Sequence, residues 1–343
     1  MDEIAPSGHA AVRIRSFAPR DLRRHLQTTS IFIALALLWI VLAFSSPYFF
    51  TTSNILNILL QSSVVGILAA GFTLVLISGE IDLSFTSVSA LAGVVAAVLI
   101  VQDGVPLVLG IILVLGVGAV AGLVNAYMTI IAGIPSFIVT LAMLGIAQGL
   151  AFVLTGAQTI QGFPHAYGVL GQGKVWGIPV PVFFLVGVYL VLHFLLSHRP
   201  FGIDVYAVGG SRRAATLAGL RPGRVVMIAF VISGVLAAVA GIILSAQLDA
   251  GQGNFGQSNL LDAIAAVVIG GSSLNGGYGT FVGTAGGVLV VTSINNGLVI
   301  VGVSPFWVQV VVGLIILAAV MTDRLAKGEL DLRQLVPIPR RGS

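Results

Sequence analysis

The residues of this chain that could take part in chemistry form no catalytic or metal-binding pattern. Its 343 residues include no cysteine, which removes thiol nucleophiles, thiolate metal sites and disulfides. Five histidines are scattered along the chain, and none has a second histidine at the helical spacing of a metal site. They are His9, His25, His165, His193 and His198. The sequence therefore predicts neither a catalytic residue nor a metal ligand.

A nucleotide site is not predicted either. The glycine-rich stretch GGSSLNGGYG (270–279) lacks the lysine that reaches the phosphates in a phosphate-binding loop. We therefore expect no cofactor on this chain and no hydrolysis of nucleotide by the chain alone.

Acidic residues within apolar surroundings are the clearest local signal. Glu80 and Asp82 lie in SGEIDLS (78–84), and Asp262 stands at the start of the short helix expected in LLDAIAAVVIGG (260–271). Acids at membrane depth are candidates for a transport pathway, but carboxylates also cap the positive ends of helices. We favour capping and local hydrogen bonding, because Asp82 and Ser84 suit the start of a helix at 84. The candidates for either role are Glu80, Asp82, Ser84, Asn125, Asp262, Asn295 and Asn296.

A short helix is predicted inside a polar loop at 198–224. Ser211 is a good N-cap, Gly219 suits the left-handed position after the helix, and Pro222 prevents its continuation. Ala214 and Ala215 would form a small surface for the groove of another protein. A plain solvated linker helix is the alternative. The residues of interest are Gly209, Gly210, Ser211, Arg212, Arg213, Ala214, Ala215 and Gly219.

Charge is strongly segregated along the chain. Apart from Lys174, all Lys and Arg residues lie in three groups, within 13–24, 199–224 and 324–341. The stretches 26–79, 104–173 and 263–322 carry no Asp, Glu, Lys or Arg. A charge at the centre of a bilayer costs about 2.5–3.5 kcal/mol, and basic residues are retained on the cytoplasmic side. The three groups therefore predict cytoplasmic regions, with both termini inside the cell.

Composition places the chain in a membrane. It is 57% hydrophobic and 8% charged, with a mean hydropathy of +1.08, whereas soluble domains carry about 25% charged residues. The pI of 9.8 follows from the cytoplasmic basic groups and needs no nucleic-acid partner. Membrane lipid is the expected surrounding.

Apolar runs predict an all-α polytopic membrane protein with about ten transmembrane helices in two halves of five. The expected helices are 30–46, 55–78, 84–101, 106–131, 135–154, 179–197, 225–248, 260–272, 280–301 and 305–322. The stretch 260–272 is too short for a full crossing. Residues 1–29 and 326–343 would be cytoplasmic tails, 30–325 the transmembrane domain, and 155–178 an external loop. A similar polar break in 74–93 and 266–285 is compatible with an internal duplication.

Five stretches in order resemble the permease subunit of ribose-type bacterial ABC importers over about residues 30–325. They are GFTLVLISGEIDLS (71–84), VNAYMTIIAGIPSFIVTLAMLGIAQGLAFVLTG (124–156), YAVGGSRRAATLAGL (206–220), LDAIAAVVIGGSSLNGGYGTFVGT (261–284) and INNGLVIVGVSPFWVQVVVGLIILAAVMTDR (294–324). The resemblance implies a subunit of the bacterial inner membrane that pairs with a second permease, identical or related. It also implies two partners. One is a cytoplasmic ABC ATPase, which would bind the ATP and would contact the helix at 211–218, and the other is a periplasmic sugar-binding protein.

Two alternatives to sugar import stay open at this point. The wider superfamily also moves branched-chain amino acids, although the GxIDLS element is typical of its sugar branch. An autonomous secondary transporter would use acids such as Glu80 and Asp82 for proton coupling.

The chain departs from the family pattern at two places. Arg212 and Arg213 replace acidic residues that usually precede the Ala-Ala pair, which predicts a matching charge difference on the ATPase. Leu260 stands where a Glu is common, which weakens the case for an acidic pair with Asp262.

Overall fold

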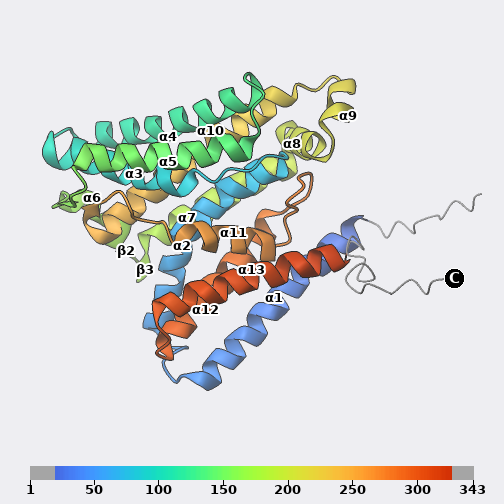
Figure 1. Cartoon of the computed structure of the whole chain (residues 1–343). Helices are drawn as coiled ribbons and strands as arrows, with labels where there is room; N and C mark the ends of the chain where they lie inside the picture. Colours follow the sequence, from blue (N-terminus) through green and yellow to red (C-terminus); the bar gives the residue numbers. More distant parts are fainter. Residues whose placement is uncertain (1–19, 327–343) are drawn as a thin grey trace, which may run out of the picture.

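The computed structural model describes residues 20–326, and these form a bundle of helices with two short antiparallel strand pairs (Figure 1). Of the predicted tails, residues 1–19 and 327–343 lie outside the described residues, and 20–29 form the start of helix α1 rather than a part of an extended tail. The helices are α1 (Arg20–Ser45), α2 (Thr52–Ile77), α3 (Phe85–Ala97), a π-helical turn (Val98–Gln102), α4 (Leu107–Ile130), α5 (Ser136–Thr155), α6 (His165–Gln172), α7 (Val180–His198), α8 (Pro200–Gly210), α9 (Arg212–Leu217), α10 (Pro222–Leu248), α11 (Asn259–Ile269), α12 (Phe281–Ile300) and α13 (Pro305–Ala326). The strands are β1 (Ile160–Gln161), β2 (Lys174–Val175), β3 (Ile178–Pro179) and β4 (Ala250–Gly251).

A helix lies at each of the ten predicted ranges. Within the described part of the chain, seven are long and apolar enough to cross a bilayer: α2, α3 with its π-helical turn, α4, α5, α7, α10 and α12. The apolar portions of α1, α11 and α13 are shorter. The protein is therefore an all-α polytopic membrane protein with several crossings. Because a crossing needs about 20 residues, α11 with its 11 residues spans only part of the bilayer's thickness.

The long helix α10 is the centre of the bundle, and it packs against α2, α3, α4 and α6. Its approach to α4 is a backbone contact, because a side chain at Gly118 would overlap the Gly234 carbonyl group and one at Gly122 would overlap that of Phe230. Small residues allow membrane helices to approach this closely. Since α10 follows the central loop but packs among α2–α4, the two predicted halves are interleaved.

Polar side chains join α2 to α12 along their length. Ser62 bonds Thr292 at 2.7 Å, and Thr73 bonds Thr284 at 2.9 Å. Such bonds between membrane helices contribute about 0.6 kcal/mol each on average. At the end of α2 nearest α1, Asn296 donates to Asn54 at 2.9 Å. These bonds fix the register of α2, which precedes the break at 78–84, against α12, which follows the break at 270–280.

The predicted loop 155–178 contains structure that sequence patterns did not indicate. It forms α6 and pairs its strand β1 antiparallel with β4, while β2 and β3 form a hairpin. The ring of Tyr167 stacks on Phe163 with centroids 4.1 Å apart, and its hydroxyl bonds Ser245 of α10 at 2.7 Å. Burial raises the pKa of Tyr167 well above its usual value, so this hydroxyl stays protonated.

Figure 1 shows how the ends of the bundle differ. The beginning of α1, the end of α13 and the helices α8 and α9 lie at one end, and α6 with the β2–β3 hairpin lies at the other. The described ends of the chain therefore lie at the same end of the bundle as the 198–224 loop, and the cytoplasmic location of this end stays a prediction.

Candidate functional site

Two non-helical breaks interrupt the bundle at the end that carries α8 and α9. The first, residues 78–84, joins α2 to α3, and the second, residues 270–280, joins α11 to α12. Both lie in the two stretches whose similar polar breaks suggested duplication. Irregular backbone within a membrane protein must find partners inside the protein, so the contacts of these breaks define the site.

Asp82 is buried in the first break, where it accepts three hydrogen bonds. The donors are the Ser84 amide at 2.9 Å, the Ser84 hydroxyl at 2.6 Å and the Ser233 hydroxyl of α10 at 2.8 Å. Ser84 in turn accepts from the Asn125 side chain of α4 at 2.9 Å. Asp82 therefore joins the start of α3 to α4 and α10, and its oxygens are engaged by protein donors.

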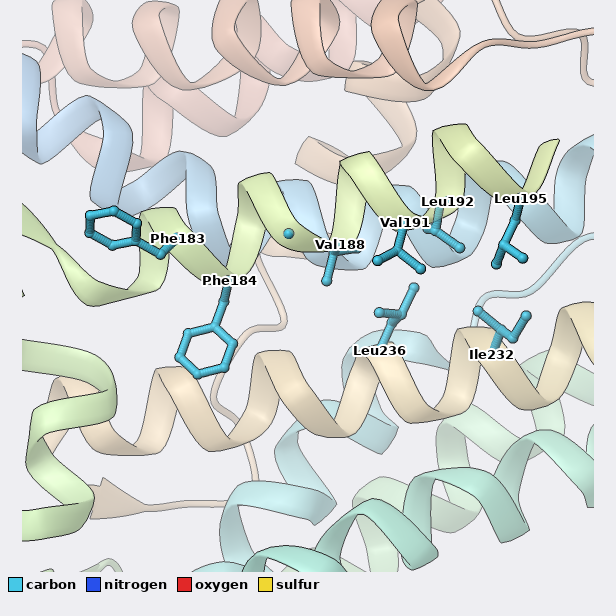
Figure 2. A pocket seen from close by; sticks show the side chains of 9 residues that line it. Phe183, Phe184, Val188, Val191, Leu192, Leu195, Ile232 and Leu236 are labelled. Carbon is cyan, nitrogen blue, oxygen red and sulfur yellow. The ribbon is translucent and has the colours of Figure 1, made fainter. Parts of the chain in front are cut away.

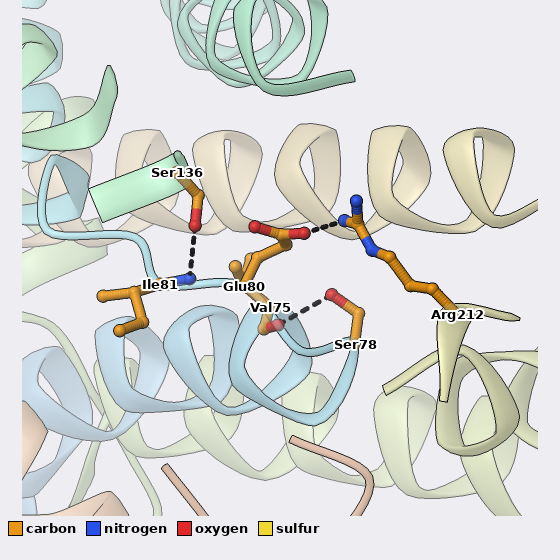
Figure 3. A network of polar contacts seen from close by, with 6 residues as sticks. All are labelled: Val75, Ser78, Glu80, Ile81, Ser136 and Arg212. Atoms are coloured by element: carbon orange, nitrogen blue, oxygen red, sulfur yellow. Dashed lines mark hydrogen bonds and ion pairs between the residues drawn. The ribbon is translucent and has the colours of Figure 1, made fainter. Parts of the chain in front are cut away.

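Glu80, two residues earlier, has a different partner. It is 7% exposed, and its carboxylate forms an ion pair with the Arg212 guanidinium of α9 (Figure 3). Glu80 does not bond a helix N-terminus through its side chain. The pair connects the first break directly to the short helix of the central loop.

The backbone around Glu80 is held by hydrogen bonds on both sides. The Glu80 amide donates to the Val75 carbonyl at 3.2 Å, and the Ile81 amide donates to the Ser136 hydroxyl of α5 at 3.1 Å (Figure 3). Thr140 of α5 donates to the Ile81 carbonyl at 3.1 Å. These bonds hold the backbone around Glu80 in place against α2 and α5.

Glycines bring the two breaks and α8 into backbone contact. A side-chain carbon at Gly209 of α8 would overlap the Ile77 carbonyl oxygen at the end of α2 and lie 2.7 Å from the Gly277 nitrogen. The Gly277 amide donates to the same Ile77 carbonyl at 2.9 Å. A side-chain carbon at Gly276 would lie 2.6 Å from the Gly79 Cα atom. We call this contact of Gly79, Gly209, Gly276 and Gly277 the glycine junction.

Glycine is required in the junction for conformation as well as space. Gly79, Gly276 and Gly277 have φ angles of +86°, +80° and +69°, in the region that side chains other than glycine rarely adopt. Beside them, the Tyr206 hydroxyl of α8 donates to the Gly279 carbonyl at 2.7 Å. The central loop is thereby attached to both breaks.

The helix α9 has the predicted caps. The Ser211 hydroxyl accepts from the Ala214 amide at 3.2 Å, and Gly219 has a φ of +83°. The helix spans Arg212–Leu217, and α8, which was not predicted, precedes it.

One side of α9 differs from the prediction. Ala215 is only 3% exposed and packs in the protein's own core, so the expectation that it shares an outward surface with Ala214 is wrong. All other residues of α9 are exposed: Arg212, Arg213, Ala214, Thr216 and Leu217. The expected charge difference on the ATPase rested on Arg212 and Arg213. Because Arg212 pairs with Glu80 within the chain, Arg213 is left as its main support.

The remaining candidates lie near the opposite end of the bundle. Asn295 donates to Asp262 at 3.0 Å, joining α12 to α11, and Asn296 bonds Asn54. From Asn54 to the first break, α2 runs for most of its 26 residues, which corresponds to roughly 35 Å at 1.5 Å per residue. The predicted acids therefore form two separate groups.

Sequence patterns missed several residues of the site. Leu217 is 82% exposed, and its position three residues after Ala214 on a short helix was a usable signal for a shared face. The Glu80–Arg212 pair had no such signal, because 132 residues separate its partners. The paired glycines in LNGGYG indicated a turn but not what it contacts.

Comparison with known proteins supports a transport role. The family model for the permease component of the branched-chain amino acid transport system matches residues 54–320. The ribose import permease protein RbsC of Bacillus subtilis is 42% identical over 301 residues, covering 87% of this chain and 93% of its own length. RbsC of Escherichia coli K12 is 38% identical (85% and 92%), and the D-allose transport system permease protein AlsC of the same strain is 36% identical (86% and 90%). No solved structure matches significantly.

The family match covers the whole bundle from α2 to α13 and includes both breaks, the glycine junction and α9. The relatives match across nearly their full lengths. The chain therefore belongs to the family of permease components of bacterial transport systems in which the sugar-import permeases are found.

Proposed function

We propose that this chain is the translocation subunit of an ATP-binding-cassette importer that passes a monosaccharide across the bacterial inner membrane. The names of its relatives, which include ribose, D-allose and xylose permeases, support the sugar class over branched-chain amino acids. As in those relatives, the chain is a multi-pass transport subunit rather than an enzyme. A periplasmic binding protein would deliver the sugar, and a second permease subunit would complete the pathway.

The ATPase would act on the chain through α9. The observation that carries this proposal is the attachment of the α8–α9 segment to both breaks, by the glycine junction and by the Glu80–Arg212 pair. A force applied to α9 from outside therefore reaches α2, α3, α11 and α12 through fixed contacts. Such a connection is what a subunit powered by a separate ATPase requires.

Proton coupling through the acids of the first break is less compatible with their contacts. Asp82 accepts three hydrogen bonds and Glu80 pairs with Arg212. A proton carrier has to exchange its proton with a pathway, whereas these carboxylates hold helices together. The secondary-transporter alternative is therefore not favoured.

Leu217→Glu tests the proposed contact of α9 with the ATPase. The side chain is 82% exposed, so its replacement should change the free energy of unfolding by no more than about 0.5 kcal/mol. If Leu217 fills an apolar pocket of the ATPase, the buried charge should reduce ATP-dependent sugar uptake in proteoliposomes by about tenfold or more. The ATPase should also co-purify in smaller amounts.

The matched control is Ile203→Glu on α8, where the side chain is 72% exposed. Uptake and ATPase recovery by this control should stay near wild type. Full activity of Leu217→Glu would remove α9 from the contact. If the wild-type chain with its ATPase showed no ATP-dependent uptake, the proposed function itself would be wrong.

The proposed topology places both termini and the 198–224 loop in the cytoplasm and the 155–178 loop outside, with ten helices entering the membrane. The chain has no cysteine, so single cysteines can be introduced at the exposed residues Lys174 and Arg213. In spheroplasts, a membrane-impermeant maleimide should label Lys174→Cys at once and Arg213→Cys only after permeabilisation. The reverse pattern would invert the topology.

A further inference from the structure

An apolar groove of about 520 Å³ lies between α7 and α10. Seven of its lining residues come from α7 and two, Ile232 and Leu236, from α10. Figure 2 shows these two side chains pointing towards Val188, Val191 and Leu195 of α7. Every lining residue is glycine or hydrophobic, so nothing in the groove can bond the hydroxyl groups of a sugar.

The groove has the depth of one membrane leaflet. Its α7 residues run from Phe183 to Leu195, which corresponds to about 18 Å at 1.5 Å per residue, and one leaflet of the hydrocarbon core is about 15 Å thick. Only 17% of the apolar stretch of α7 is buried, against 67% for α10, so α7 lies at the periphery. The groove therefore opens on the periphery of the bundle.

Arg199 stands near one end of this groove, in contact with a ring side chain of α7. Gly187, Val191, Phe194 and His198 follow one another at helical spacing on the same face of α7. The His198 ring stacks on Phe194 with centroids 5.3 Å apart, and the Arg199 guanidinium carbon lies 5.1 Å from the centre of the Phe194 ring. Arg199 itself follows Leu195 by four residues, about one helical turn.

Arg199 has a positive charge without a carboxylate partner. Among the side chains that the structure describes, the one ion pair joins Arg212 to Glu80 and does not involve Arg199. Arg199 is exposed. Contact with an aromatic face stabilises a guanidinium without neutralising it. The exposed cation at the end of an apolar groove complements a molecule with a long hydrocarbon chain and an anionic head.

We infer that the α7–α10 groove binds an anionic phospholipid, with an acyl chain along Gly187 and Val191 and its phosphate at Arg199. The lipid belongs to the leaflet on the side of α8 and α9, which is the cytoplasmic leaflet under the proposed topology. Lipid binding itself does not depend on the transport function. A second copy of the chain is the competing occupant.

Lipid retention tests this inference on the full chain, extracted from nanodiscs of phosphatidylglycerol and phosphatidylcholine in equimolar amounts. Native mass spectrometry should show wild type keeping phosphatidylglycerol preferentially. Arg199→Gln should lower retention about fivefold, the effect of one basic residue at an anionic surface. Gly187→Leu should lower it about tenfold or more, because a leucine occupies space that acyl methylenes would fill. A side chain at Gly187 meets no atom within 4 Å, so the variant should fold normally.

Two control variants separate the groove from general lipid contact. Gly149→Leu adds the same side chain to an equally open position of α5, and Arg213→Gln removes an exposed charge from α9. Both should retain phosphatidylglycerol like wild type. Unchanged retention by Arg199→Gln and Gly187→Leu would overturn the inference. So would disulfide-linked dimers of Val191→Cys in membranes, because they would place a second copy at the groove.

Discussion

Gly209→Ala should abolish ATP-driven uptake, whereas Gly210→Ala should leave it near the wild-type rate. The new methyl group at 209 would overlap the Ile77 carbonyl oxygen, but at 210 it would meet no atom within 4 Å. Inserting a methyl group into a well-packed contact costs about 1–3 kcal/mol, occasionally more. Because the obstructing atoms are backbone, α8 has to move away from both breaks.

The measurement is sugar uptake in proteoliposomes that contain the ATPase, alongside hydrolysis in the same samples. We expect Gly209→Ala to lower uptake by about tenfold or more while part of the hydrolysis persists, since the exposed surface of α9 is unchanged. Recovery from the membrane and thermal stability in detergent report on folding. Equal uptake by the two alanine variants would show that the glycine junction is dispensable.

Arg212→Glu should be the most damaging single charge change in the central loop. It sets a second carboxylate against Glu80, which is 7% exposed and already removed from solvent. Breaking a buried pair costs about 3–5 kcal/mol when both groups are buried, and the value here is smaller because the Arg212 side chain is 48% exposed. We expect a loss of uptake of at least about tenfold.

Neutral variants reveal the asymmetry of the pair. Arg212→Gln leaves a buried carboxylate without its cation, which costs about 1–3 kcal/mol, whereas Glu80→Gln leaves a half-exposed guanidinium that water can solvate. Arg212→Gln should therefore be worse than Glu80→Gln, and the double variant should recover most of the uptake lost by Arg212→Gln. Additivity of the two single effects would show that the pair does not act as a unit.

Arg213→Glu is the matched control for salt dependence. Arg213 is exposed, and exposed pairs are worth about 0.2–1 kcal/mol and are screened by salt. Its effect should be small and should shrink at high ionic strength. The Arg212→Glu defect should persist under the same conditions.

Periodicity and charge placed the helices well because a bilayer imposes strong rules on composition. Apolar length predicted a helix at every expected position, including the short α11, and Ser211 with Gly219 set the limits of α9 correctly. The loop at 155–178 was harder to predict, because α6 is held by contacts such as Tyr167 with Ser245 rather than by a sequence pattern of its own. Local signals are weak where tertiary contacts determine structure.

The candidate site shows the same difference between residues with a local sequence signal and residues placed by tertiary contacts. Asp82 and Ser84 could be selected from their sequence neighbourhood, because their bond is local. Ala215 was placed on the wrong side of α9, since the two neighbouring alanines have the same chemistry and only packing distinguishes them. Glu80 and Arg212 were both selected, but their pairing depends on how α8 folds back on α2, which neither segment encodes alone.

The glycine junction contains no side chains between its three backbones, and this limits how α8 can move. In an ordinary contact, a leucine or methionine can change its rotamer and absorb a shift of an ångström or more. Here the Gly209 backbone lies directly against the Ile77 carbonyl group and the Gly277 amide, which are bonded to each other. A displacement of α8 towards them has to move the ends of α2 and of the second break together. The two breaks consequently share one degree of freedom, and the membrane segments that follow them shift in step rather than in succession.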